Sequence, residues 1–158
     1  MKKEKTAMLG LAATSAMTLF SYIISERKGK NFKEPLLLSG FLKNSGFTTE
    51  KGAANWAGWL THYAVGEALA LAHPYAWRKT HSGPSVGSGL TLGALAGLGG
   101  IAIWHLCFKM HPQPPKTNHY RFYGHLFLAH IVFSLTMSLG YKKIGTRISD
   151  YPHSNFNS

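Results

Sequence analysis

The chain has 158 residues and carries 17 Lys and Arg against 6 Asp and Glu, a formal net charge of +11. This length suits one domain. Such a charge can indicate a nucleic-acid-binding protein, but only 15% of the residues are charged, against about 25% in soluble domains. We therefore exclude nucleic acid as a partner and expect a single membrane domain over residues 1–158.

Four stretches of the sequence are almost free of charge. Residues 6–25, 80–108 and 122–141 contain no Asp, Glu, Lys or Arg, and residues 52–77 contain only Glu67. A helix of about 20 residues crosses a hydrocarbon core about 30 Å thick. The pattern predicts an all-α polytopic membrane protein whose four transmembrane helices form an antiparallel bundle. The predicted spans are residues 6–25, 53–73, 86–108 and 120–141.

Basic and aromatic residues flank these spans, as expected at a membrane–water boundary. They predict a multi-pass membrane protein that meets anionic lipid headgroups. Lys and Arg are balanced between the two sides, so the orientation stays open. The first span could instead be a signal peptide, although its apolar stretch is longer than a usual signal core.

The connections between the spans differ in character. Residues 32–47 mix Leu and Phe with Lys and Glu, and Pro35 suits a first helical turn, so we expect a short helix lying in the interface. Residues 111–115 are rich in proline and should be extended. The polar tail, residues 145–158, should be loose.

Small residues recur at intervals of four and predict close helix packing. The third span carries Gly89, Gly93 and Gly97, and the second carries Gly58 and Gly66. A glycine-lined ligand passage is the alternative.

The sequence also hints at a duplicated helical hairpin. Residues 61–66 (THYAVG) resemble residues 129–134 (AHIVFS), and both stretches lie in the middle of an even-numbered span. Such a duplication would give two parallel halves.

Five ionisable residues lie within the spans, namely His62, Glu67, His105, His125 and His130. Ionisable groups in hydrocarbon are costly and usually face the bundle interior. At about 1.5 Å per residue, His62 matches His130 in depth and His105 matches His125.

Three interpretations of these residues compete. In the first they hold the bundle together by hydrogen bonds, in the second they sense or relay protons, and in the third they bind haem b or a metal between helices. A transporter-like oligomer is a further alternative, and a homo-oligomer without transport is another.

No catalytic motif is present, so we predict a protein that is not an enzyme, with no resident metal site and most simply no cofactor. Cys107 is the lone cysteine and should be a small buried side chain. His73, His81, His111, His119 and His153 lie in connections or near span ends and should be solvated.

The order of several short motifs between residues 52 and 141 resembles the YagU-like family of small bacterial inner-membrane proteins. The motifs are the stretch 56–75, the sequence GALA at 93–96, WH at 104–105, PQPP at 112–115 and YGHL at 123–126. The first 50 residues depart from the family pattern. The resemblance implies an integral inner-membrane protein linked to acid tolerance, without a settled molecular activity. We therefore expect a small pH-responsive membrane protein that acts through its intramembrane histidines.

Overall fold

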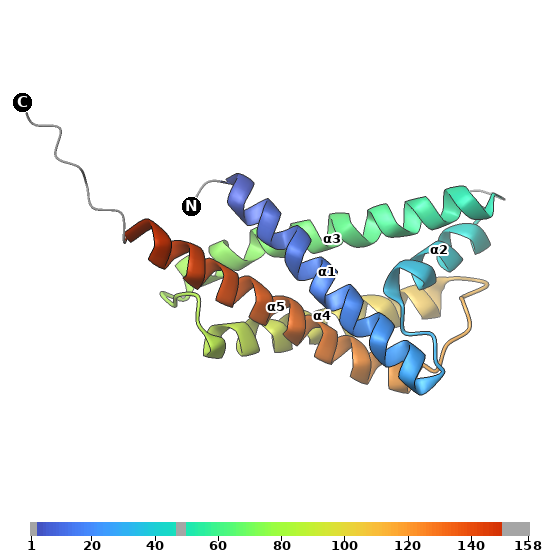
Figure 1. Cartoon of the computed structure of the whole chain (residues 1–158). Helices are drawn as coiled ribbons and strands as arrows, with labels where there is room; N and C mark the ends of the chain where they lie inside the picture. The colour runs from blue at the N-terminus through green and yellow to red at the C-terminus, as the bar shows by residue number, and fades with distance from the viewer. Residues whose placement is uncertain (1–2, 47–49, 150–158) are drawn as a thin grey trace, which may run out of the picture.

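The computed structural model describes residues 3–46 and 50–149, and the side chains of residues 4–46 and 50–144. All regular secondary structure in this part of the chain is helical, without a strand, so the all-α prediction is confirmed (Figure 1). The helices are α1 (Lys3–Lys28), α2 (Glu34–Asn44), α3 (Lys51–Lys79), α4 (Val86–Met110) and α5 (His119–Ser149).

Three of the four predicted spans coincide with helices that are long and apolar enough to cross a membrane. These segments are Glu4–Lys28, Val86–Met110 and His119–Ile144. The predicted second span is helical within α3, which has 29 residues. However, α3 is too polar along its length to qualify by composition, because His62, Glu67 and His73 interrupt its apolar sequence.

Helix α5 is the centre of the packing. It lies along both α4 and α1, α1 also packs on α3, and α3 packs on α2. Five side chains of α5 recur at helical spacing and are completely buried: Phe122, Leu126, Ala129, Phe133 and Met137. In Figure 1, α1 crosses in front of α3, and α5 runs in front of α4.

Helices α3 and α4 do not pack along one another. In a bundle with two equivalent hairpins, the α3–α4 contact would be the counterpart of the α1–α5 contact. The described part of the chain therefore lacks the twofold arrangement that a simple hairpin duplication would produce.

Glycines mark the places where helices approach most closely. A Cβ atom added at Gly93 would lie 2.8 Å from the Cα of Ile131, and one added at Gly97 would lie 3.1 Å from the Cα of Phe127, both on α5. Gly89 meets the same helix at Ser138. Since neither backbone can yield to a side chain, these glycines set the distance between α4 and α5.

The glycines of α3 face two different neighbours. A Cβ at Gly58 would lie 2.7 Å from the backbone nitrogen of Ser39 on α2, whereas Gly66 is covered by the side chain of Thr14 on α1. The row of small residues on α3 thus packs against α2 near one end of the helix and against α1 further along.

The α1–α2 connection is a tight turn that folds α2 back against the end of α1. Gly29 has a φ of 57°, a conformation that favours glycine. The Ser25 hydroxyl accepts a hydrogen bond from the Phe32 backbone at 3.1 Å. This turn carries Glu34, in the first turn of α2, to the side of Ser21 on α1.

The predicted interfacial segment, residues 32–47, contains α2, while residues 47–49 lie outside the described residues. Leu37 and Ser39 of α2 are buried. The proline-rich connection is not helical, bends at residues 112 and 113, and contacts α2, where Asn44 donates a hydrogen bond to the Gln113 carbonyl at 2.8 Å.

The predicted start of the loose tail, residue 145, is wrong, because α5 continues as far as Ser149. Residues 145–149 therefore extend the last helix. Residues 150–158 lie outside the described residues.

Candidate functional site

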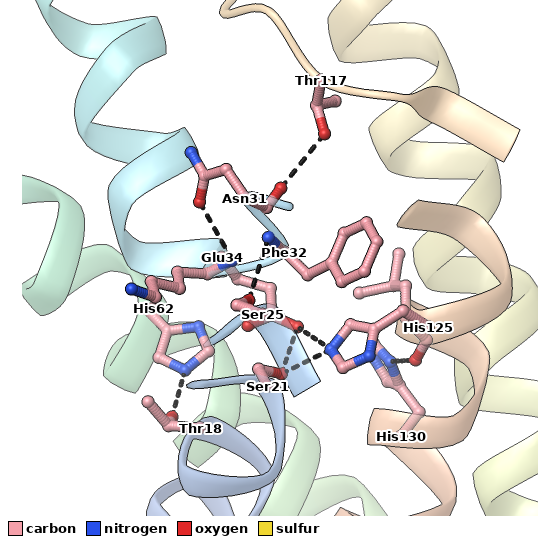
Figure 2. Close-up of polar contacts among 12 residues, drawn as sticks. Thr18, Ser21, Ser25, Asn31, Phe32, Glu34, His62, Thr117, His125 and His130 are labelled. Atoms are coloured by element: carbon pink, nitrogen blue, oxygen red, sulfur yellow. Dashed lines mark hydrogen bonds and ion pairs between the residues drawn. The ribbon is translucent and has the colours of Figure 1, made fainter. Parts of the chain in front are cut away.

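Three buried polar side chains from three helices form a hydrogen-bonded chain (Figure 2). The Ser21 hydroxyl donates to Oε1 of Glu34 at 2.9 Å. Nε2 of His125 lies 2.9 Å from the same hydroxyl oxygen and 3.9 Å from that carboxyl oxygen. Ser21 thus bridges a carboxyl group on α2 and an imidazole on α5.

This hydrogen-bond chain can run in two directions. With Glu34 ionised, the serine donates to the carboxylate and His125 donates its Nε2 proton to the serine oxygen. With Glu34 protonated, the carboxyl donates to the serine, which then donates to an unprotonated Nε2. When the imidazole starts doubly protonated, passage from the first arrangement to the second moves one proton through the serine to the carboxylate and leaves a neutral imidazole, so the geometry can hold or relay a proton.

Aromatic rings hold His125 in place. Its ring stacks on Phe20 of α1 at a centroid distance of 5.3 Å and on Phe32 of the α1–α2 turn at 5.1 Å. Two stacked faces exclude water from the imidazole and leave its edge to make hydrogen bonds. The contact with Ser21 is therefore fixed in orientation.

Glu34 lies outside the three candidate spanning segments, yet it is only 2% exposed. Its Oε2 atom is buried and has no hydrogen-bond partner among the described residues. The neighbouring cation, Lys33, bonds Glu26 at 2.5 Å instead. Burial therefore disfavours the charged form and raises the pKa of the Glu34 carboxyl to about 7.

Sequence reasoning missed Glu34, because it counted the residue among the charges outside the membrane and treated Glu67 as the one carboxyl within it. A signal was available in α2. Glu34 shares a helical stripe with Leu37 and Phe41, three and seven residues further on. A carboxyl on the apolar face of a short helix is a candidate for burial.

Of the two histidine pairs expected from depth, His62 and His130 line one cavity. Nε2 of His62 lies 2.8 Å from the Thr18 hydroxyl on α1, and Nδ1 of His130 donates to the Leu126 carbonyl at 2.9 Å.

The second pair does not share an environment. His105 is exposed and lies 3.4 Å from the Tyr123 hydroxyl, whereas His125 is buried against α1 and α2.

Glu67 is partly exposed and packs against the backbone of α1. A Cβ at Gly10 would lie 2.7 Å from its Oε1 atom, which is buried without a hydrogen-bond partner among the described residues. Glu67 thus contacts α1 at a position separate from the Glu34 site.

Two other expectations were wrong. His73 is only 2% exposed, and its ring bonds the Leu69 carbonyl at 2.8 Å and the Ser134 hydroxyl at 3.0 Å. Its position three residues after Ala70 continues the small-residue stripe of α3, which is the signal that predicts its burial. Cys107 is exposed rather than buried, because it faces the space beside α4 that α3 leaves open.

That space is a cavity of about 890 Å³ between α3 and α4. Its walls are mostly apolar, and α2 closes one end. Its polar lining includes Glu34, His62, His130 and Thr14.

The haem alternative finds little support in this cavity. His62 directs Nε2, the usual haem-ligating atom, to Thr18. The ring of His130 lies against Gly100, where an added Cβ would approach Nε2 to 3.1 Å. No group of three or more His, Cys, Asp or Glu in the described part of the chain has the geometry to hold a metal ion.

Comparisons of the chain with family models, curated proteins and solved structures find no match. The class of protein therefore follows from the fold and site alone. Three long apolar helices, α5 together with α1 and α4 that pack on it, indicate a helical membrane protein. Its distinguishing feature is a carboxyl–hydroxyl–imidazole chain buried at one end of the bundle, and the YagU-like resemblance stays a prediction.

Proposed function

We propose that this chain is a small, non-enzymatic, four-pass protein of the cell inner (plasma) membrane whose conformation responds to pH through Glu34, Ser21 and His125. The observation that carries the proposal is the buried carboxyl of Glu34, bonded through one hydroxyl to a histidine and unpartnered at its second oxygen. A carboxyl whose pKa is raised to about 7 changes its charge near neutral pH.

The position of the Glu34–Ser21–His125 hydrogen-bond chain explains how a change in protonation alters the structure. Glu34 joins α2 to α1 and α5, so ionising it places a negative charge where three helices meet. A buried charge without full compensation is costly. The structure can relieve that cost by moving α2 away and admitting water.

Several titratable and charged groups lie near the carboxyl. His125 faces it from α5 and Tyr22 lies near it on α1, while Lys33 precedes it in the chain. His62 of α3 and His111 at the end of α4 line the same cavity. When His125 is protonated, its Nε2 atom forms an ion pair with Oε1 of Glu34 at 3.9 Å.

Helix α3 supplies the fourth crossing in this proposal. Its 29 residues are about 43 Å long at about 1.5 Å per residue, more than a hydrocarbon core requires. Its polar side chains His62 and His73 turn inward to bond α1 and α5. Intramembrane polar residues that face the bundle interior are compatible with a spanning helix.

Anionic lipid headgroups are the proposed external partner. A second cavity, of about 1000 Å³, lies between the end of α1 and the start of α5. Its lining includes Lys28, Lys30 and Arg121, all exposed, beside apolar and aromatic side chains. This combination suits a phosphate headgroup with its chain in the membrane.

The YagU-like resemblance and its link to acid tolerance agree with a pH-responsive role. They support the proposal only as a resemblance, and the hydrogen-bond chain supports it independently.

The test is hydrogen–deuterium exchange of the full chain in lipid nanodiscs at pH 5 and pH 8. After correction for the intrinsic pH dependence of amide exchange, the wild-type protein should be less protected in α2 and the α1–α2 turn at pH 8 than at pH 5. Glu34→Gln, which cannot ionise, should keep the same protection at both pH values. Glu4→Gln, a change at an exposed carboxyl, is the matched control and should behave as wild type. Equal pH dependence of wild type and Glu34→Gln would refute the proposal.

A further inference from the structure

The cavity between α3 and α4 opens sideways at the surface of a helix apolar enough to span a membrane. Ile103 and Met110 of α4 are 64% and 79% exposed, and Val65 of α3 is 61% exposed, yet all three line the cavity. Its mouth is therefore a row of exposed apolar side chains. In a bilayer such an opening faces lipid chains.

The inner part of the cavity presents polar atoms that the protein itself leaves unused. Oε2 of Glu34 and Oγ1 of Thr14 are both buried without a hydrogen-bond partner among the described residues. The two residues are 2% and 1% exposed, and both line the cavity. Buried polar atoms normally have partners, so their absence points to a ligand that supplies them.

The charges of the lining indicate the chemistry of that ligand. Among the described residues, no Lys or Arg lines this cavity. A phosphate headgroup would find no cation there and would meet the Glu34 carboxyl. A hydroxyl group, by contrast, can both donate to and accept from Oε2 of Glu34. The volume of about 890 Å³ lies within the range of roughly 300–1,000 Å³ typical of small-molecule sites.

We infer that this cavity binds a neutral lipid that has a hydroxyl-bearing head, with its chain between α3 and α4 and its hydroxyl at Glu34. The lipid enters from the bilayer through the opening beside Ile103 and carries no net charge. The inference goes beyond the pH response, since it depends on Oε2 of Glu34 and the cavity rather than on the bridge from Oε1 to His125.

One glycine offers a way to fill the cavity without disturbing the helices. Gly99 lines the cavity, and a Cβ added there would have no heavy atom within 4 Å. Phenylalanine at this position should occupy the space where the chain would lie. Gly87, on the same helix, lies outside the cavity lining, and a Cβ there would meet only Ser85, at 3.9 Å. Gly87→Phe is therefore a matched control.

The experiment uses the full chain in phosphatidylcholine nanodiscs with a monoacylglycerol that carries a photoreactive diazirine in its chain. After illumination, mass spectrometry maps the labelled residues. We expect labelling at the cavity-facing residues of α3 and α4, and competition by unlabelled monoacylglycerol. Gly99→Phe should reduce labelling at least about tenfold, which corresponds to about 1.4 kcal/mol, while Gly87→Phe should leave it unchanged.

A second variant keeps the test valid if Gly99→Phe misfolds. Ile103→Trp enlarges an exposed side chain at the mouth of the cavity, so the added volume need not disturb the core. It should also reduce labelling. Unchanged labelling in both Gly99→Phe and Ile103→Trp would overturn the inference.

Other occupants give different results. Equal labelling and competition by a diazirine phosphatidylcholine would show a phospholipid site, and crosslinks between two chains that vanish in Gly99→Phe would show a second copy. Either result would contradict the neutral-lipid assignment.

The pH response can fail separately from lipid binding. Glu34→Gln keeps a polar acceptor at the cavity and should retain labelling, although it should lose the pH-dependent exchange.

Discussion

Replacing Glu34 by glutamine should remove a specific part of the pH dependence of stability. The carboxyl is 2% exposed and its pKa is raised from 4.5 to about 7 by burial. Between these two values the folded state binds a proton that the unfolded state has released. Stability in the wild type must therefore fall as the pH rises from about 4.5 to about 7.

The size of the effect follows from the same two values. Each pKa unit corresponds to about 1.36 kcal/mol, so the Glu34 contribution to the free energy of unfolding should fall by about 3 kcal/mol across this range. Above about pH 7 both states are ionised and the contribution is constant. For a chain of this size, about 3 kcal/mol corresponds to a melting temperature lower by about 6–12 °C.

The assay is thermal unfolding in detergent at pH 4.5, 5.5, 6.5 and 7.5 for wild type and Glu34→Gln. The difference between the two proteins removes the contributions of other titrating groups. Wild type should lose stability relative to the variant as the pH rises. A constant difference, or a relative gain by wild type at high pH, would refute the argument that burial governs this carboxyl.

Three further predictions concern individual contacts, each measured by thermal unfolding in detergent. Ser21→Ala removes the bridge from Glu34 to His125, so it should destabilise the protein by about 1–3 kcal/mol and move the Glu34 transition to higher pH; an unshifted transition would contradict the bridge. Gly93→Ala should cost about 1–3 kcal/mol by overpacking, because its Cβ would lie 2.8 Å from an α5 backbone atom, while Gly99→Ala should be neutral; equal effects would contradict the packing. Thr18→Val should cost about 1 kcal/mol through the lost bond to a buried histidine, and no change would indicate that the bond contributes nothing.

The helices and their contact faces could be predicted because they follow from local patterns. Gly93 and Gly97 lie four residues apart, and the structure turns both of them toward α5. The row of small residues from Gly58 to Gly66 likewise lies on the buried face of α3. Helical periodicity depends on neighbouring residues, so one sequence is enough to reveal it.

The site depended on contacts that periodicity does not encode. Glu34 lies 13 residues from Ser21 and 91 from His125 along the chain, and the turn at Gly29 decides that they meet. Counting charges by sequence position placed Glu34 outside the bundle. Its burial follows only when α2 is known to fold back onto α1.

The cavity between α3 and α4 could not be predicted from the sequence either. A duplicated hairpin predicts that α3 and α4 pack together, as α1 and α5 do, whereas the structure leaves them apart. Cys107 was expected to be buried because it lies in an apolar run, and it is exposed instead. Which pair of helices stays apart is a property of the whole bundle.

The most direct test of the central claim is infrared difference spectroscopy of the carboxyl groups in the folded protein. Spectra recorded between pH 5 and pH 8 in wild type should show a protonated carboxyl that ionises near pH 7, and Glu34→Gln should remove that signal. The same signal in Glu67→Gln would assign it to Glu34 rather than to the carboxyl of α3. Full ionisation of every carboxyl by pH 6 in the wild type would contradict the account.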